Sequence, residues 1–130
     1  MNEAALLGSM PFAVAAGVLL DSASKTEVRG RLPWAEDRCT AGGLMHGGAL
    51  MTLADSVGAV CAYLNLPEGA STSTVSSSTS LVRGVRSGEA HAVARPLHVG
   101  RSFILVGVEV TDDDGRLVAS VSQNQAVLRP

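Results

Sequence analysis

Apolar residues form one long run in the middle of the chain, directly after the motif His46-Gly47-Gly48. Ala, Leu and Met dominate this run as far as Leu64, with Gly58 as the one glycine inside it and no proline. The pattern predicts a helix from about Gly47 to Leu64. Because apolar residues fall on nearly every side, we expect this helix to be buried on more than one side, by a strongly wrapped sheet or by a second subunit.

Four segments with strand-like patterns follow the helix, at about 71–83, 89–99, 102–111 and 116–128. The motif Asp112-Asp113-Asp114-Gly115 predicts a hairpin turn between the last two, and Gly100 is a weaker signal between the middle two. Short turns join antiparallel neighbours, so the second half of the chain predicts an antiparallel sheet.

The segment 71–80 reads STSTVSSSTS and allows two interpretations. Its composition is that of a flexible linker. A linker here would leave two pieces too small to maintain separate cores, whereas Thr and Val favour strands. We therefore expect a strand with hydroxyl groups on both of its faces.

The N-terminal quarter of the chain carries weaker signals. Residues 2–9 predict a short helix capped by Asn2, which Pro11 ends or redirects. From about 14 to 32 the sequence predicts an extended pair or one long bent strand, with a turn at 21–24.

A loop over 33–43 completes the set of elements. One long helix and about five or six antiparallel strands predict an α+β fold, in which a curved sheet wraps the central helix. At 130 residues, we expect a single domain over 1–130.

The apolar fraction of 46% argues against disorder, and the four aromatic residues leave Val, Leu and Ala to build the core.

Charge and cysteine usage exclude several classes of function. The net charge is −2 with scattered Lys and Arg, which argues against nucleic acid as a partner. Cys39 and Cys61 show no metal-ligand spacing and no disulfide framework. The apolar run 11–20 is too short to cross a membrane, and it lacks the basic residues that precede a secretory signal. We expect a cytoplasmic protein with no membrane partner.

Asp55 is the unusual residue of the central helix, because burying an unpaired charge is expensive. On a helical wheel it shares a small, polar stripe with Thr52, Ser56, Ala59 and Tyr63. This stripe predicts one wall of a pocket, with Ser56 and Ala59 in contact with a substrate. The alternative is a buried aspartate that Ser or backbone donors satisfy.

The start of the helix offers a second chemical feature. Gly47 and Gly48 present backbone N–H groups at the positive end of the helix dipole, and a ligand oxygen can approach glycine closely. Such a terminus suits the developing negative charge on a carbonyl oxygen. The alternative is an ordinary glycine-containing helix start, with His46 as a cap or core residue.

The motif HGGALMTLADS at 46–56, Gly-Arg-Ser at 100–102 and the strand order around them resemble the PaaI-like hotdog-fold acyl-CoA thioesterases. The resemblance covers about residues 14–128, and its most specific part is 46–55. It implies a helix wrapped by an antiparallel sheet, a homodimer with shared active sites that often pairs into a dimer of dimers, an acyl-CoA substrate and no further cofactor.

By the same resemblance, Asp55 is the catalytic carboxylate, acting as general base on water or as nucleophile. The Gly47 N–H polarises the thioester carbonyl, and His46 fixes its loop. Thr74 and Ser78 match strand positions that face the site, and Thr74 orients the attacking water. The positions that contact the substrate in this family match Gly48, Arg83, Arg101 and Ser102 in this chain.

Two positions depart from the family pattern. Gly84 replaces the proline that commonly follows the residue matching Arg83, and Thr40 stands where the family frequently has Asn or Gln, six residues before the histidine. A threonine hydroxyl is shorter than an amide and does only part of its work in orienting water or carbonyl. The departure at Thr40 leaves open a protein that binds acyl-CoA without fast turnover.

Spacing along the helix tests this assignment. Gly47 and Asp55 are eight residues apart, which is about 12 Å along a helix. A base and an oxyanion donor must each come to about 3 Å from one reacting group. Two antiparallel helices related by a two-fold axis meet this requirement and one helix does not.

Other chemistries have less support. His91 and His98 form no metal-ligand spacing with His46, so we expect no metal site. Cys61 is expected to be a core residue, and Ser9 lacks a nucleophile-elbow motif. A dehydratase on the same fold would hydrate an enoyl group with a histidine and a carboxylate in a different motif, which this sequence does not show.

Overall fold

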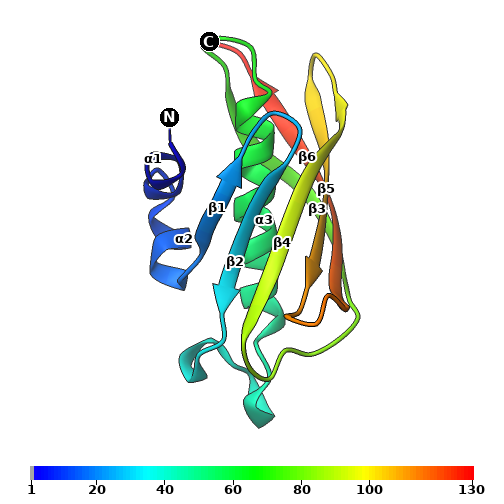
Figure 1. The fold of residues 1–130 in the computed structure, drawn as a ribbon. Helices are drawn as coiled ribbons and strands as arrows, with labels where there is room; N and C mark the ends of the chain where they lie inside the picture. The colour runs from blue at the N-terminus through cyan, green and yellow to red at the C-terminus, as the bar shows by residue number, and fades with distance from the viewer. Residues whose placement is uncertain (1) are drawn as a thin grey trace.

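The computed structural model describes residues 2–130 and packs one long helix, α3 (Gly47–Leu64), against a six-stranded antiparallel sheet (Figure 1). The strand order across the sheet is β1-β2-β4-β5-β6-β3. The strands are β1 (Leu19–Ala23), β2 (Val28–Pro33), β3 (Ser71–Leu81), β4 (Glu89–Val99), β5 (Phe103–Thr111) and β6 (Leu117–Leu128). The bounds of α3 agree with the sequence prediction, and those of β3 to β6 agree to within two residues.

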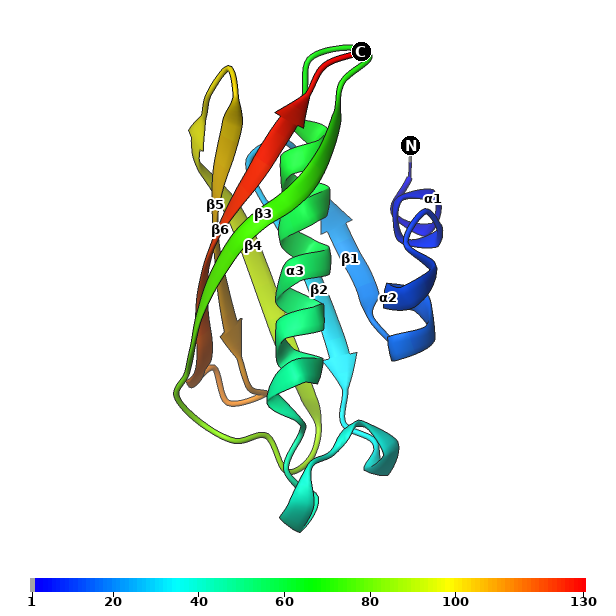
Figure 2. The ribbon, with the colours of Figure 1, turned by 180° about the vertical axis from the view of Figure 1, so that it is seen from behind.

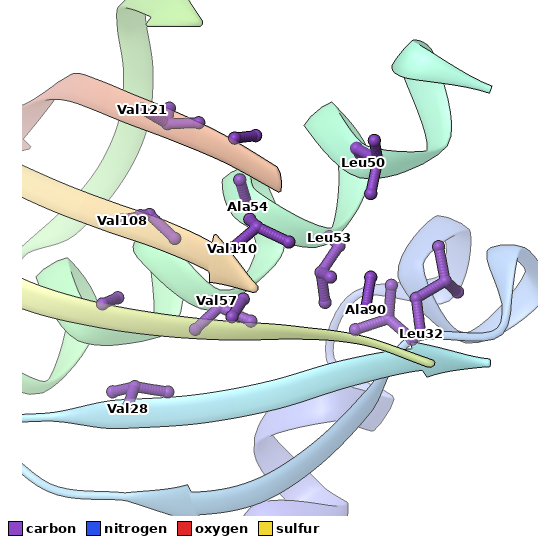
Figure 3. Packing of buried hydrophobic residues seen from close by; sticks show 14 of the residues in the cluster. Val28, Leu32, Leu50, Leu53, Ala54, Val57, Ala90, Val108, Val110 and Val121 are labelled. Atoms are coloured by element: carbon purple, nitrogen blue, oxygen red, sulfur yellow. The ribbon is translucent and has the colours of Figure 1, made fainter. Parts of the chain in front are cut away.

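The sheet curves around α3 so that strands from both of its halves reach the helix (Figure 2). Leu53, Ala54 and Val57 of α3 are fully buried. Figure 3 shows them next to the face of the sheet that carries Val108 and Val110 of β5, Ala90 of β4, and Val28 and Leu32 of β2. The core consists of Val, Leu and Ala, as the scarcity of aromatic residues predicted.

One stripe of α3 remains uncovered by its own sheet. Met51, Asp55 and Tyr63 are exposed along this stripe, with Met51 exposed to 45% and Tyr63 to 44%. The wrapped sheet thus buries the helix on more than one side, as expected, and leaves this one stripe open within a single chain. Asp55 lies on the open stripe instead of deep in the core.

The N-terminal segment contains two short helices, of which the sequence predicted the first and not the second. Helix α1 (Glu3–Gly8) is capped by Asn2, whose side chain accepts a hydrogen bond from the Ala5 N–H. A second helix, α2 (Pro11–Ala16), follows directly, and Gly17 with φ of 95° ends it. Pro11 begins this helix because its missing N–H would have no partner at that position.

The first two strands form a hairpin whose turn lies later than expected. Strands β1 and β2 pair antiparallel, and the turn at 24–27 closes with a bond from the Ser24 N–H to the Glu27 carbonyl. A turn at 21–24 is wrong, because Asp21 to Ala23 belong to β1. The loop after β2 contains two single-turn 3₁₀ helices, η1 (Glu36–Arg38) and η2 (Ala41–Gly43).

The serine-rich segment is a strand at the edge of the sheet, which confirms the strand interpretation over the linker. Strand β3 pairs with β6 along its length and shows a register shift between Thr74 and Ser76, so Val75 is a β-bulge. An extra residue in a strand exchanges the two faces beyond it. Thr74 lies opposite the buried Gln125, whereas Ser78 lies opposite the exposed Ser122.

Helix α3 is long and apolar enough to cross a membrane by length and composition alone. Half of it is buried inside the structure, as expected of the core helix of a domain. Its apolar character is thus explained by packing against the sheet.

Candidate active site

The Asp55 carboxylate is held by donors from two strands. Thr74 Oγ1 of β3 donates to Asp55 Oδ1 at 2.8 Å, and Gln123 Nε2 of β6 donates to the same oxygen at 2.9 Å. Within residues 2–130 no hydrogen bond uses Oδ2. Because Asp55 is exposed on the open stripe of α3, a carboxylate held through one oxygen leaves the other available to a ligand.

Behind these donors, Gln125 links the two strands. Its Nε2 donates to Thr74 Oγ1 at 2.8 Å and to Gln123 Oε1 at 3.1 Å. Gln123 is exposed to 1% and Gln125 to 0%. Both amides therefore lie beneath the site, shielded from solvent.

The start of α3 presents the N–H groups that the sequence indicated. His46 is the N-cap, and its Nδ1 accepts the Gly48 N–H at 2.8 Å. The His46 N–H in turn donates to the Arg38 carbonyl. In the described part of the chain, the Gly47 N–H has no acceptor, so it remains free to bind a ligand oxygen.

A hollow of about 240 Å³ lies beside this terminus and brings three of the predicted residues together. Its lining includes Thr40, Gly47 and Arg83. The rest of the lining is mostly aliphatic, so the Gly47 N–H, the Thr40 hydroxyl and Arg83 are its donors for a ligand oxygen.

A second hollow, of about 330 Å³, lies next to the Asp55 side of α3. Helix α1 and the residues after it cover one wall with Leu6 and Met10, and α3 contributes Ala59 and Tyr63. Ala59 is one helical turn beyond Asp55, and Thr72, also in this lining, is two residues before Thr74 on the same face of β3. The hollow therefore continues the Asp55 site towards the N-terminal helices.

Residues 42–119, more than half of the chain, match the Thioesterase superfamily. The chain belongs to this superfamily. It is 35% identical over 86 residues to 1,4-dihydroxy-2-naphthoyl-CoA hydrolase of Escherichia coli, covering 66% of this chain and 63% of that protein. It is 33% identical over 86 residues to the proofreading thioesterase EntH of Cronobacter sakazakii, with the same two coverages, 66% and 63%. The match thus spans less than two thirds of these relatives.

Solved structures extend the likeness to nearly the whole chain. A mutant thioesterase from Pseudomonas aeruginosa superposes with a TM-score of 0.92 at 25% identity, covering 98% of this chain and 94% of that chain. A putative esterase from Mycobacterium tuberculosis gives a TM-score of 0.89 at 30% identity, covering 93% and 98%. The hotdog fold expected for this thioesterase-superfamily member is confirmed.

Some predicted site residues of this superfamily member lie away from Asp55. Ser56 is buried, and its hydroxyl donates to the Thr52 carbonyl at 2.7 Å. Ser78 does not face the site alongside Thr74, because the bulge at Val75 places it on the outer face of the sheet. That expectation was wrong because a bulge leaves no clear signal in a run of serines and threonines.

Arg101 and Ser102 lie in the turn between β4 and β5, at the end of the sheet nearest the C-terminal end of α3 (Figure 1). Ser102 borders a shallow hollow on the outer face with Val75 and Phe103. Within one chain, neither residue lies beside Gly47 or Arg83, which are at the opposite end of the helix.

Gln123 and Gln125 were not among the predicted site residues. The inward positions of β6 alternate through Ala119, Val121, Gln123 and Gln125, and glutamine at two of them is the signal that could have found the pair. A second signal is Gly58 in the middle of α3, since a Cβ there would stand 2.2 Å from Gln123 Oε1.

Two other reactive groups are accounted for by their surroundings. Burial raises the pKa of the Cys61 thiol to about 11, which agrees with a core role. Glu89, His91 and Asp113 lie close enough to hold a metal ion, but His91 pairs with Asp113 at 2.7 Å and Glu89 pairs with Arg31 at 3.0 Å. These contacts suffice to explain the cluster as surface hydrogen bonding and ion pairing.

Proposed function

We propose that this chain hydrolyses an acyl-CoA thioester to a carboxylate and free coenzyme A. The observation that carries this proposal is the exposed Asp55, whose Oδ1 is fixed by two donors while Oδ2 has no hydrogen-bond partner among residues 2–130. The relatives named as a naphthoyl-CoA hydrolase and a proofreading thioesterase support thioesters as substrates. Water, one carboxylate and one backbone N–H suffice for this reaction, so no cofactor is required.

Asp55 acts in one of two ways in this proposal. As general base, it takes a proton from water, whose oxygen attacks the carbonyl carbon and displaces the thiolate of coenzyme A. As nucleophile, Oδ2 attacks the carbonyl carbon, expels the thiolate of coenzyme A and forms an anhydride, which water then opens to the acyl carboxylate and free Asp55. In both cases the carbonyl oxygen gains negative charge, which the Gly47 N–H stabilises.

The proposal requires a homodimer. Gly47 and Asp55 are about 12 Å apart along α3, too far to serve one carbonyl. The open stripe of α3 and the exposed edge strand β3 are adjacent, which suits a two-fold axis that runs between two antiparallel α3 helices. Each site then combines Asp55 of one protomer with Gly47 of the other, and a dimer of dimers adds no further catalytic group.

The two hollows suggest where the parts of the substrate bind. The apolar hollow next to Asp55, lined by Leu6, Met10 and Ala59, suits the acyl group. Arg83 beside Gly47 suits the phosphates of coenzyme A, and an antiparallel dimer brings Arg101 of the other protomer to the same end. Cys39 and Cys61 are both free thiols, in keeping with a cytoplasmic location.

A panel of acyl-CoAs assayed by release of free thiol tests the proposal. We expect turnover by the wild type and near-complete loss in Asp55→Asn with an unchanged melting temperature. The matched control is Glu109→Gln, which neutralises an exposed carboxylate on β5 and should keep full activity. Equal turnover by wild type and Asp55→Asn would reject the role of Asp55.

The shorter Thr40 side chain beside Gly47 supports one alternative, a protein that binds acyl-CoA without turnover. Calorimetric binding of an acyl-CoA by the wild type, without any thiol release across the panel, would select this alternative.

A further inference from the structure

The side chains around Asp55 form a closed ring of hydrogen bonds. Asp55 Oδ1 accepts from Thr74 and from Gln123, and Gln125 donates to both of these residues. The ring joins α3 to β3 and β6, the two strands at one edge of the sheet. Every member of the ring except Asp55 and Thr74 is fully buried.

The direction of each bond in the ring is forced. Thr74 has one hydroxyl proton, and since its oxygen accepts from Gln125, that proton goes to Asp55. Gln123 turns its oxygen to the Gln125 amide, so its NH₂ group faces Asp55. If both amides were reversed, Gln123 Oε1 would face Asp55 Oδ1, and the Thr74 hydroxyl would donate to Gln125 and turn its own oxygen towards Asp55. Both oxygens would then repel the carboxylate. The ring thus has one arrangement that satisfies all of its groups.

This arrangement is maintained at a cost to packing. Two inward positions of β6, next to Val121, carry amides in place of apolar residues, and a buried amide is unfavourable unless it is fully bonded. Gly58 removes the Cβ that would strike Gln123 Oε1, although glycine weakens the interior of a helix. An apolar pair with alanine at position 58 would avoid both of these costs, so the polar ring calls for an explanation other than stability.

We propose that Gln123 and Gln125 are positioning residues, which act with Thr74 to hold Asp55 in one rotamer and leave Oδ2 as its only reactive oxygen. The proposal rests on the hydrolysis proposed above and deepens it. Thr74 then serves the carboxylate: its proton is committed to Asp55 and is not available to donate to an attacking water.

The variant Gln123→Met tests this role, because methionine matches glutamine in length and lacks the donor. We expect kcat to fall about tenfold to hundredfold, the range for loss of a hydrogen bond to a charged group, with KM changed less than twofold. Gln125→Met should give a smaller loss in kcat, since it touches Asp55 only through its neighbours. The matched control is Ser122→Met, which introduces the same side chain on the outer face of β6 and should leave kcat unchanged.

A background of Asp55→Asn separates positioning from a general structural effect. If Gln123 acts through Asp55, then Gln123→Met should lower the residual rate no further in that background. Equal kcat for wild type and Gln123→Met, with Asp55→Asn inactive, would overturn the positioning role while hydrolysis stands. A wild type that releases no thiol would overturn the proposed hydrolysis instead.

Crystal structures of the wild type and Gln123→Met test the positioning role without any activity. We expect one Asp55 rotamer in the wild type and two or more, or a displaced one, in the variant. The same single rotamer in both structures would overturn the inference.

Discussion

The side-chain oxygen of Gln123 occupies the space beside Gly58 that a Cβ would need, 2.2 Å from where that atom would stand. A glycine in the middle of the core helix and a glutamine in the core face of β6 therefore depend on each other. Each alone is unfavourable, and together they place a donor on Asp55.

The variant Gly58→Ala should separate activity from stability. Alanine strengthens a helix interior by about 1 kcal/mol relative to glycine, but here its Cβ pushes Gln123 off Asp55. We expect kcat to fall about tenfold with little change in KM, measured by thiol release, because one donor to the carboxylate is lost. In a Gln123→Ala background the same change should raise the free energy of unfolding, since the collision is gone. Unchanged kcat in Gly58→Ala would contradict the dependence.

The Gly47 N–H can be removed with little change to the backbone. Proline fits the first position of a helix, and His46 before it already has the extended conformation, φ −61° and ψ 137°, that a residue before proline adopts. We expect Gly47→Pro to lower kcat about 10² to 10³-fold, as for loss of an oxyanion donor.

Gly47→Ala is the matched control for that variant. A Cβ at position 47 meets the end of the Leu81 side chain at 2.7 Å, and alanine and proline share this contact. Alanine keeps the N–H, so its kcat should stay within a few-fold of the wild type. Equal losses in both variants would assign the effect to Leu81 and not to the N–H.

The apolar hollow beside Asp55 predicts acyl selectivity. Ala59 lines this hollow of about 330 Å³, and Ala59→Phe would place a ring inside it. We expect kcat/KM for long or bulky acyl-CoAs to fall at least tenfold while acetyl-CoA is affected less than threefold, since a short acyl group does not reach the added ring. A uniform loss across the acyl series would place the acyl group elsewhere.

The Cys61 thiol should be inert in the native protein, because burial raises its pKa to about 11 from the ordinary 9.0. Labelling with N-ethylmaleimide at pH 8, followed by mass spectrometry, should modify Cys61 only after denaturation. Between pH 9 and 11 the unfolded chain loses this proton before the folded one, so the free energy of unfolding falls as pH rises. Cys61→Ala should remove that part of the alkaline loss, whereas an identical slope in both proteins would contradict it.

The sequence predicted the elements whose patterns are long and the chemistry that stands out within them. Helix α3 and the four strands after it follow from periodicity and turn residues, and Asp55 and Gly47 follow from their contrast with an apolar helix. Helix α2 was missed because six residues with Phe and Val do not distinguish a helix turn from a strand.

The rest of the site depends on tertiary structure. The bulge at Val75 decides that Thr74 faces Asp55 and Ser78 does not, and a serine-rich strand carries no apolar pattern that fixes its register. Gln123 and Gln125 look like solvent-facing residues of a strand until the pairing of β6 places them inward.

Mixing two inactive variants tests the shared site most directly. Asp55→Asn keeps an intact Gly47, and Gly47→Pro keeps an intact Asp55, so a mixed dimer with sites across the two-fold axis has one complete site and one doubly defective site. After unfolding and refolding the two variants together in equal amounts, random pairing should restore about a quarter of the wild-type kcat. A mixture no more active than its two parents would contradict the account, because it would show that each site lies within one chain.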